Sequence, residues 1–138
     1  MQTSRTRIGI IGAGPAGLML SHLLHLAHID NVILENRSRE YAENRIRAGI
    51  LEYEVAELMR ETGVGARMDA EGSRHDGTNF LVDGELTHIG FFKLTGKHVM
   101  HYSQHEVVRD LIAGRLAAEG QIIFEASDEL VPENRTGL

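Results

Sequence analysis

The sequence predicts an α/β domain built on a parallel sheet, and the first quarter of the chain carries most of that prediction. An apolar run, residues 8–11, leads through a glycine-rich turn into a helical pattern from Pro15 to about Ala27. A second apolar run follows at residues 31–34. A strand, a helix and a strand in such close succession form a βαβ unit, whose two strands run parallel. We therefore expect an α/β fold.

The turn after the first strand has the pattern of a phosphate-binding loop. Gly12 permits a sharp turn out of the strand, Gly14 leaves no side chain between the backbone and a pyrophosphate, and Gly17 lets the helix approach the sheet. Pro15 suits the first helical turn, where no N–H is needed. Free N–H groups and the positive end of the helix dipole then face the anion. The pattern predicts a Rossmann-like dinucleotide site.

An acidic residue, Glu35, closes the second strand. At that place a carboxylate accepts hydrogen bonds from the hydroxyls of an adenosine ribose and repels a 2′-phosphate. Glycine turns are common, so the alternative is a structural turn with a surface glutamate. The preceding strand, the following helix and Glu35 together favour the dinucleotide site.

Length and composition limit the class of protein. With 138 residues we expect one domain, and without cysteine the chain forms no disulfide and no thiolate metal site. The net charge of −6, with lysine and arginine scattered, argues against a nucleic-acid or anionic membrane surface. No segment has the pattern of a signal peptide or a membrane span, so we expect a cytoplasmic protein.

The rest of the chain alternates helical and strand patterns. Asp83-Gly84 between two apolar runs, residues 78–82 and 85–92, predicts a small β-hairpin inserted in the domain. The remaining expected elements are a helix over 50–62 that ends at Gly63, a strand over 97–102, a helix from 103 or 104 to 119, a strand over 121–126, and a loop after Val131.

Apolar spacing also predicts the core. The first helix is expected to bury Leu18, Leu20, Leu23, Leu24 and Ala27. The helix over 50–62 is expected to bury Ile50, Leu51, Val55, Leu58 and Met59, and the last helix Val107, Val108, Leu111, Ile112 and Leu116. Met59 and Met68 are interpreted as core residues. His28 stands where a left-handed helix cap is expected, which predicts a slightly strained helix end.

Two polar groups of residues invite a functional interpretation. Arg45 and Arg47 follow the second strand on the ligand side of the sheet, where guanidinium groups pair with phosphate oxygens; the alternative is a solvated basic loop. His22, His25 and His28 lie three residues apart, so His22 and His28 diverge around the helix. We therefore expect no metal site.

Four blocks of sequence, in order and over about residues 7–126, resemble the flavin-dependent aromatic hydroxylases, and within them the enzymes that act on 4-hydroxybenzoate. The blocks are residues 12–18, 29–35, 45–52 and 102–111. Many enzymes share the glycine loop, whereas the Arg-Ile-Arg-Ala-Gly block at 45–49 is much more specific. The joint match is therefore stronger than the glycine motif alone.

The resemblance implies FAD as the bound dinucleotide. Glu35 would hold the ribose, the glycine loop the pyrophosphate, Arg45 and Arg47 the phosphates or the isoalloxazine side, and Gln104 the flavin's linker region. The segment from Asn36 to Glu43 matches the part that selects the nicotinamide reductant in this family, with NADH and NADPH both open. The full set implied to bind the cofactor is Gly12, Ala13, Gly14, Pro15, Ala16, Gly17, Glu35, Arg45, Ile46, Arg47, Ala48, Gly49, Ile50 and Gln104.

The resemblance also implies a reaction: hydroxylation next to the hydroxyl group of a phenolic acid such as 4-hydroxybenzoate, with O2 and NAD(P)H as co-substrates. A homodimer is implied as well. The flavin supplies that chemistry while the protein orients the reactants and excludes water, so no catalytic side chain is assigned.

Members of the family continue well beyond the length of this chain. One interpretation is that residues 1–138 form the N-terminal part of an FAD-binding domain, without a substrate domain and inactive alone. An open sheet edge favours this interpretation. A second is a self-contained module that binds FAD or NAD without catalysis. A third, an NAD-dependent dehydrogenase, needs a substrate-side base that the scattered histidines do not offer.

Overall fold

A three-stranded parallel sheet forms one end of the protein. The computed structural model describes residues 5–127, and the sheet in it has the order β1 (Ile8–Ile11), β2 (Asn31–Leu34), β8 (Gln121–Ile123). Ile10, Ile33 and Ile122 lie in register across the three strands. Helix α1 (Pro15–Leu26) connects β1 to β2, so the predicted βαβ unit and α/β fold are confirmed.

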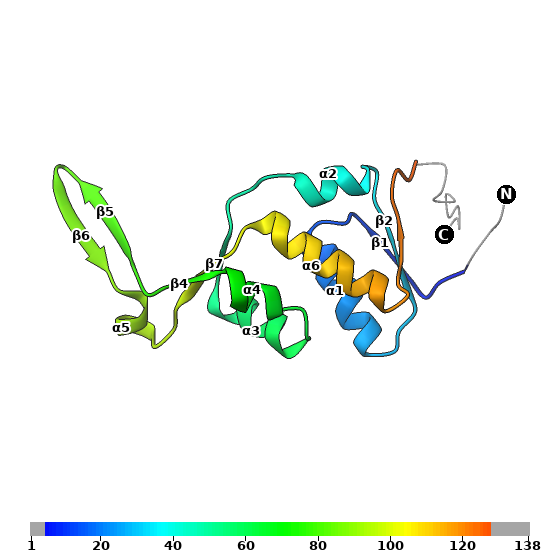
Figure 1. Cartoon of the computed structure of the whole chain (residues 1–138), viewed down its shortest axis with the longest axis horizontal. Coiled ribbons are helices and arrows are strands. Elements are labelled where there is room, and N and C mark those ends of the chain that lie inside the picture. Colours follow the sequence, from blue (N-terminus) through cyan, green and yellow to red (C-terminus); the bar gives the residue numbers. More distant parts are fainter. Residues whose placement is uncertain (1–4, 128–138) are drawn as a thin grey trace, which may run out of the picture.

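The core lies between this sheet and two helices, α1 and α6 (Gln104–Ala117), which pack side by side (Figure 1). Leu18 of α1 and Ile33 of β2 are completely buried. The predicted apolar face of α6 is buried at Val107, Val108, Leu111 and Ile112. Branched side chains at helical spacing thus fill the space over a β-branched sheet face, which is the packing that the sequence pattern predicts.

The middle of the chain forms a second, antiparallel sheet and three short helices. The sheet has the order β3 (Ile50–Leu51), β7 (Val99–His101), β4 (Ser73–His75). The helices are α2 (Arg39–Asn44), α3 (Tyr53–Glu61) and α4 (Ala66–Glu71). The elements α2, α4 and β4 lie in stretches where the sequence analysis predicted no element.

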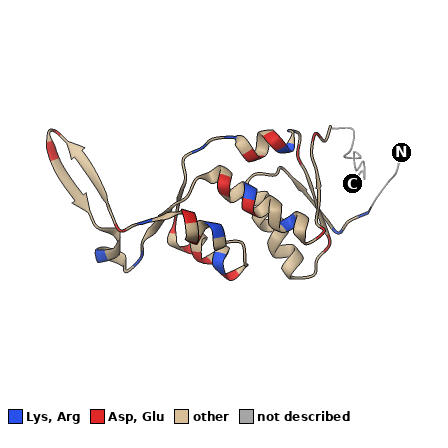
Figure 2. Cartoon of the chain, viewed as in Figure 1, with Lys and Arg blue, Asp and Glu red and all other residues tan. Residues whose placement is uncertain are grey.

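The predicted hairpin is confirmed as β5 (Thr78–Val82) and β6 (Glu85–Ile89), which extend away from the rest of the chain (Figure 1). Its turn residues, Asp83 and Gly84, both have positive φ angles of 50° and 82°, as a two-residue hairpin turn requires. Phe91 and Phe92, predicted as the end of the second strand, instead begin α5 (Phe91–Thr95). Figure 2 shows that the hairpin carries few charged side chains compared with α2, α3, α4 and α6.

The predicted helix over 50–62 is wrong at its start. Ile50 and Leu51 pair with His101 and Met100 in the antiparallel sheet, and Glu52 is the extended N-cap of α3. Ile50 is 67% exposed and Val55 is also exposed, whereas Met59 is buried as predicted. Pairing with β7 decides this local conformation, because a distant strand satisfies the backbone groups of Ile50 that a helix would otherwise satisfy.

The buried face of α1 also differs from the prediction. Leu20, Leu23 and Ala27 are exposed, whereas Ser21 and His22 are buried next to Leu18. The Ser21 hydroxyl donates to the Asn31 side chain, and Nε2 of His22 lies 2.8 Å from the carbonyl oxygen of Thr62. These hydrogen bonds offset the free-energy cost of burying the Ser21 hydroxyl and Nε2 of His22. Helical spacing alone does not reveal such partners.

The remaining predictions meet mixed outcomes. His28 has a φ of 58°, so the strained helix end is confirmed, and Met68 is fully buried as expected. Leu116 is 39% exposed and Arg115 is buried in its place. The last strand ends at Ile123 rather than at residue 126, and the loop predicted after Val131 lies outside the described residues. Among residues 5–127, no helix is long and apolar enough to cross a membrane.

Candidate cofactor-binding site

A cavity of about 460 Å³ lies where β1 and β2 end and α1 begins. Open α/β sheets bind ligands outside the carboxyl ends of their strands, which is where this cavity lies. The cavity is lined by seven residues of the predicted site: Ala13, Gly14, Pro15, Glu35, Arg45, Arg47 and Gln104. Six further residues complete the lining: Asn36, Arg37, Tyr41, Ala42, His105 and Val108.

The glycine loop has the geometry that the sequence analysis predicts. Gly12 turns with a φ of 101°, and a Cβ on Gly17 would lie 2.2 Å from the carbonyl oxygen of Gly12. By contrast, a Cβ on Gly14 would meet no protein atom within 4 Å. Gly14 is the N-cap of α1 and makes no side-chain hydrogen bond there. The start of the helix therefore presents open space and backbone N–H groups, which together suit an anionic group.

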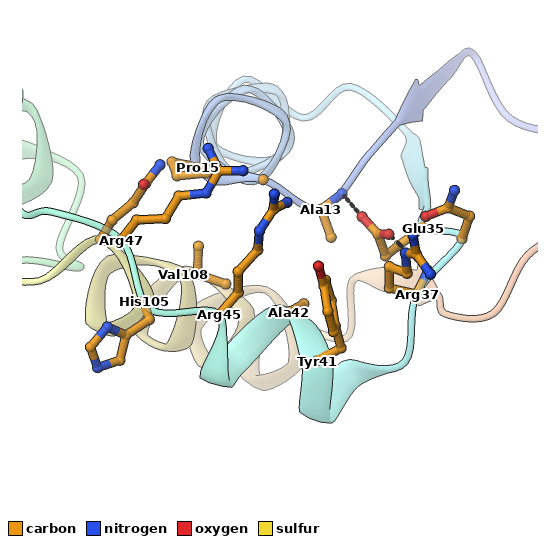
Figure 3. Close-up of a pocket in the computed structure, with 13 residues that line it drawn as sticks. Ala13, Pro15, Glu35, Arg37, Tyr41, Ala42, Arg45, Arg47, His105 and Val108 are labelled. Carbon is orange, nitrogen blue, oxygen red and sulfur yellow. Dashed lines mark hydrogen bonds between the residues drawn. The ribbon is translucent and has the colours of Figure 1, made fainter.

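Glu35 lines the cavity beside the glycine loop and contacts it directly. One carboxylate oxygen accepts a hydrogen bond from the backbone N–H of Ala13 at 2.7 Å, and the other from that of Arg37 at 2.8 Å (Figure 3). These contacts fix the carboxylate beside the first strand. A carboxylate has about four acceptor positions, so the two oxygens retain capacity for the hydroxyls of a ribose.

Positive charge faces the loop from the segment after α2. Figure 3 shows the side chains of Arg45 and Arg47 directed toward Pro15 at the start of α1. Arg45 also lies 5.8 Å from the centre of the Tyr41 ring, and Arg37 lies 5.4 Å from it. Cation–π contacts of this kind hold a guanidinium in place and leave its N–H groups free to donate. The arrangement is suited to bind phosphate.

Helix α6 forms the remaining wall with Gln104, His105 and Val108. His105 lines the cavity, although no pattern in the sequence connects it with the loop. Tyr41 and Arg37 belong to the polar stretch that the resemblance connects with the nicotinamide reductant, and in the structure they line the cavity near Glu35. Tyr41 lies in α2, and Arg37 directly precedes its N-cap, Ser38, so a helix that the sequence pattern did not predict positions both side chains.

Several residues of the predicted set do not line the cavity. Ile46 is 84% exposed, and Ala48 and Ile50 are also exposed, away from the loop. Gly49 is buried, and a Cβ there would lie 2.3 Å from the carbonyl oxygen of Tyr102. Gly12, Ala16 and Gly17 shape the loop through their backbone. Gly49, just before β3, therefore packs against the backbone just after β7 and does not line the cavity.

A network of charged side chains holds α6 against α4 next to the site. Arg67 donates to Glu106 at 2.7 Å and to Asp110 at 2.6 Å, and the buried Tyr102 hydroxyl donates to the same Asp110 carboxylate. The hydrogen bond from Arg67, with the nearby Arg109, lowers the pKa of Glu106 below its usual range. Burial and the Asp110 carboxylate raise the pKa of Tyr102.

We expect this network to make stability depend on pH. Because the pKa of Glu106 is lowered in the folded state, its carboxylate stabilises the fold at neutral pH, and this contribution is lost as the pH falls below the ordinary pKa of a glutamate toward the lowered folded-state pKa. Arg67→Met should lower the free energy of unfolding by about 1 kcal/mol at pH 7. Urea unfolding between pH 3 and 7 measures this, and a difference that stays constant over the whole range would contradict it.

Comparison with known proteins identifies the family. A model of the family described as the FAD binding domain matches residues 5–137, nearly the whole sequence. The chain belongs to this FAD-binding domain family. It is also 42% identical, over 129 residues, to the p-hydroxybenzoate hydroxylase of Acinetobacter baylyi, and that match covers 93% of this chain and 32% of the relative. This chain thus spans about a third of the length of the curated relative.

Solved structures support the fold. The chain is similar to PqsL of Pseudomonas aeruginosa in complex with 2-aminobenzoylacetate, with a TM-score of 0.80 and 20% identity over 88% of this chain and 34% of that one. It is also similar to p-nitrophenol 4-monooxygenase PnpA of Pseudomonas putida, with a TM-score of 0.74 and 19% identity over 91% of this chain and 33% of that one. At these identities the likeness concerns the fold, which is that of part of a flavin-dependent monooxygenase.

Proposed function

We propose that this FAD-binding domain binds FAD in the cavity between the glycine loop, Glu35 and the arginine segment. The observation that carries the proposal is the convergence of three complementary groups on one space: an open helix start at Gly14, the ribose acceptor Glu35, and the guanidinium groups of Arg45 and Arg47. Each group matches a different part of an adenine dinucleotide.

Different residues of the site bind different parts of the cofactor. Glu35 accepts hydrogen bonds from the adenosine ribose, because its carboxylate is already oriented by the N–H groups of Ala13 and Arg37. The start of α1 and the two arginines neutralise the pyrophosphate. Gln104, on the α6 side of the cavity, is placed for the linker that leads to the flavin ring.

In a protein of the relatives' length, we propose that this domain serves an aromatic hydroxylase that uses NAD(P)H and O2. The bound flavin supplies redox and oxygen-transfer chemistry, and the residues described above hold and orient it. The 42% identity with p-hydroxybenzoate hydroxylase supports a phenolic acid such as 4-hydroxybenzoate as substrate. We also propose a homodimer as the assembly, and no hydroxylase activity of this chain alone.

Titration of the purified chain with FAD, followed by flavin fluorescence, tests the proposal, with a parallel NAD titration. Saturable binding of FAD, tighter than that of NAD, is expected. Binding of NAD in preference to FAD would favour a different dinucleotide module, and no binding of either by the folded chain would overturn the proposal.

Substitution of Glu35 tests the ribose assignment. Glu35→Ala should weaken FAD binding about 10- to 100-fold, because it removes two hydrogen bonds to a charged acceptor. The control is Glu40→Ala, which removes an exposed carboxylate of α2 that does not line the cavity. If Glu35→Ala bound FAD as tightly as the parent chain, the ribose role would be wrong.

A further inference from the structure

The end of α2 is tied to α6 by one side chain, that of Asn44. Its amide nitrogen donates to the backbone carbonyl of Glu40 at 2.8 Å, and its amide oxygen accepts a hydrogen bond from Arg109 at 2.6 Å. The first contact closes the last turn of α2, and the second fixes that turn to α6. Asn44 immediately precedes Arg45, so the tie lies at the point where the arginine segment begins.

Arg109 is itself held in place by a second partner. Its other terminal nitrogen donates to one carboxylate oxygen of Glu106 at 2.6 Å, and the other oxygen of Glu106 accepts from Arg67 at 2.7 Å. Charge-assisted hydrogen bonds are about twice as strong as neutral ones. A continuous series of such contacts therefore runs from α4, across α6, to the last residue of α2.

The other contacts of the arginine segment are few: Ala42 of α2 packs partly against the core, and Arg45 lies beside the Tyr41 ring. Helix α2 buries none of its side chains completely, and residues 44–48 are all exposed. Gly49 is the next buried residue, and its carbonyl oxygen accepts the N–H of Tyr102 at 3.0 Å. The segment is thus anchored at Gly49 by the second sheet and at Asn44 by Arg109, with Arg45 and Arg47 between the two anchors.

We propose that Arg109 is a positioning residue for the cofactor phosphates. It lies outside the cavity and holds the end of α2 through Asn44, which keeps the guanidinium groups of Arg45 and Arg47 directed at the start of α1. Fixing these side chains before binding lowers the entropy lost when they meet a phosphate. The inference rests on the proposed FAD function and deepens it.

The test uses two substitutions that break the same contact from opposite sides. Asn44→Ala removes the acceptor without changing charge, and Arg109→Met removes the donor. Each should weaken FAD binding about three- to fivefold, as expected for the loss of one partly exposed charged contact. Arg60→Met is the matched control, because it also removes an arginine from ion pairs with Glu57 and Asp69, far from the cavity, and should leave FAD affinity unchanged.

A combined variant separates positioning from a general structural effect. In the background of Arg45→Met with Arg47→Met, Asn44→Ala should cause no further loss of affinity, because the groups that it positions are gone. In the background of Glu35→Ala, it should still cause the same three- to fivefold loss. Equal losses in both backgrounds, or unchanged affinity in the single variants, would overturn the inference.

Hydrogen exchange gives a readout that does not depend on FAD. In the absence of ligand, the amides of residues 42–47 should exchange at least about threefold faster in Asn44→Ala and Arg109→Met than in the parent chain or in Arg60→Met. If the parent chain does not bind FAD, the proposed function fails, and this exchange rate still decides whether Arg109 holds the segment. Unchanged exchange would overturn the inference in either case.

Discussion

Gly14→Val should lower the affinity for FAD at least 100-fold and leave the fold intact. Gly14 has a φ of −77°, which any residue adopts, and a Cβ there meets no protein atom within 4 Å. A valine therefore changes the free energy of unfolding by no more than about 1 kcal/mol, the size of an N-cap effect. Its side chain instead occupies the space beside the helix start, where a phosphate has to approach the backbone.

Two measurements check this prediction together. Flavin fluorescence gives the affinity, and urea unfolding followed by circular dichroism gives the stability. Gly9→Val serves as the control, because Gly9 also has open space around its Cβ position but lies within β1, away from the cavity. A Gly14→Val chain that bound FAD like the parent would refute the close approach of the phosphate. A chain that failed to fold would contradict the open space seen at Gly14.

Gly49→Ala should have the largest effect on stability, lowering the free energy of unfolding by about 3 kcal/mol. The added Cβ would lie 2.3 Å from both the carbonyl oxygen of Tyr102 and the Cα of Ser103, so the backbone just before β3 has to move away from the backbone just after β7. Such a shift also weakens the hydrogen bond from the Tyr102 N–H to the Gly49 carbonyl.

The urea midpoint of Gly49→Ala, compared with that of Ala48→Ser, tests this role. Ala48 is the exposed neighbour on the same segment, so Ala48→Ser should leave the midpoint close to that of the parent chain. If both variants had the midpoint of the parent chain, Gly49 would not be required for the contact between the two segments, and a direct role in cofactor binding would regain support.

The conformational preferences of single residues made the first βαβ unit and the hairpin predictable. Gly12 needs its left-handed backbone, Gly17 needs the absence of a side chain, and Asp83-Gly84 needs two positive φ angles, so residue identity alone indicates each turn. The apolar face of α6 was predictable for the same reason, because one continuous stripe packs on one surface. In these regions neighbouring residues already determine the conformation.

Other regions depend on partners that are distant in the sequence. Ile50 has a helical pattern but forms a strand, because β7 supplies its hydrogen bonds. Ser21 and His22 are buried in place of Leu20 and Leu23, because Asn31 is a partner for the Ser21 hydroxyl and the Thr62 carbonyl is a partner for Nε2 of His22. Sequence periodicity records only the hydrophobicity of a residue and not the partners that the fold brings to it.

The sequence by itself determined the α/β class, the phosphate loop and the place of Glu35, since strand, turn and helix each follow from nearby residues. The tertiary structure alone decided which polar residues surround the loop. It brought Arg37 and Tyr41 beside Glu35, placed His105 in the wall of the cavity, and moved Ile46 and Ile50 away from it. The physical reason is that Asn44 of α2 and Arg109 of α6 are 65 positions apart in the sequence, so the tertiary fold brings them together and no local pattern encodes their contact.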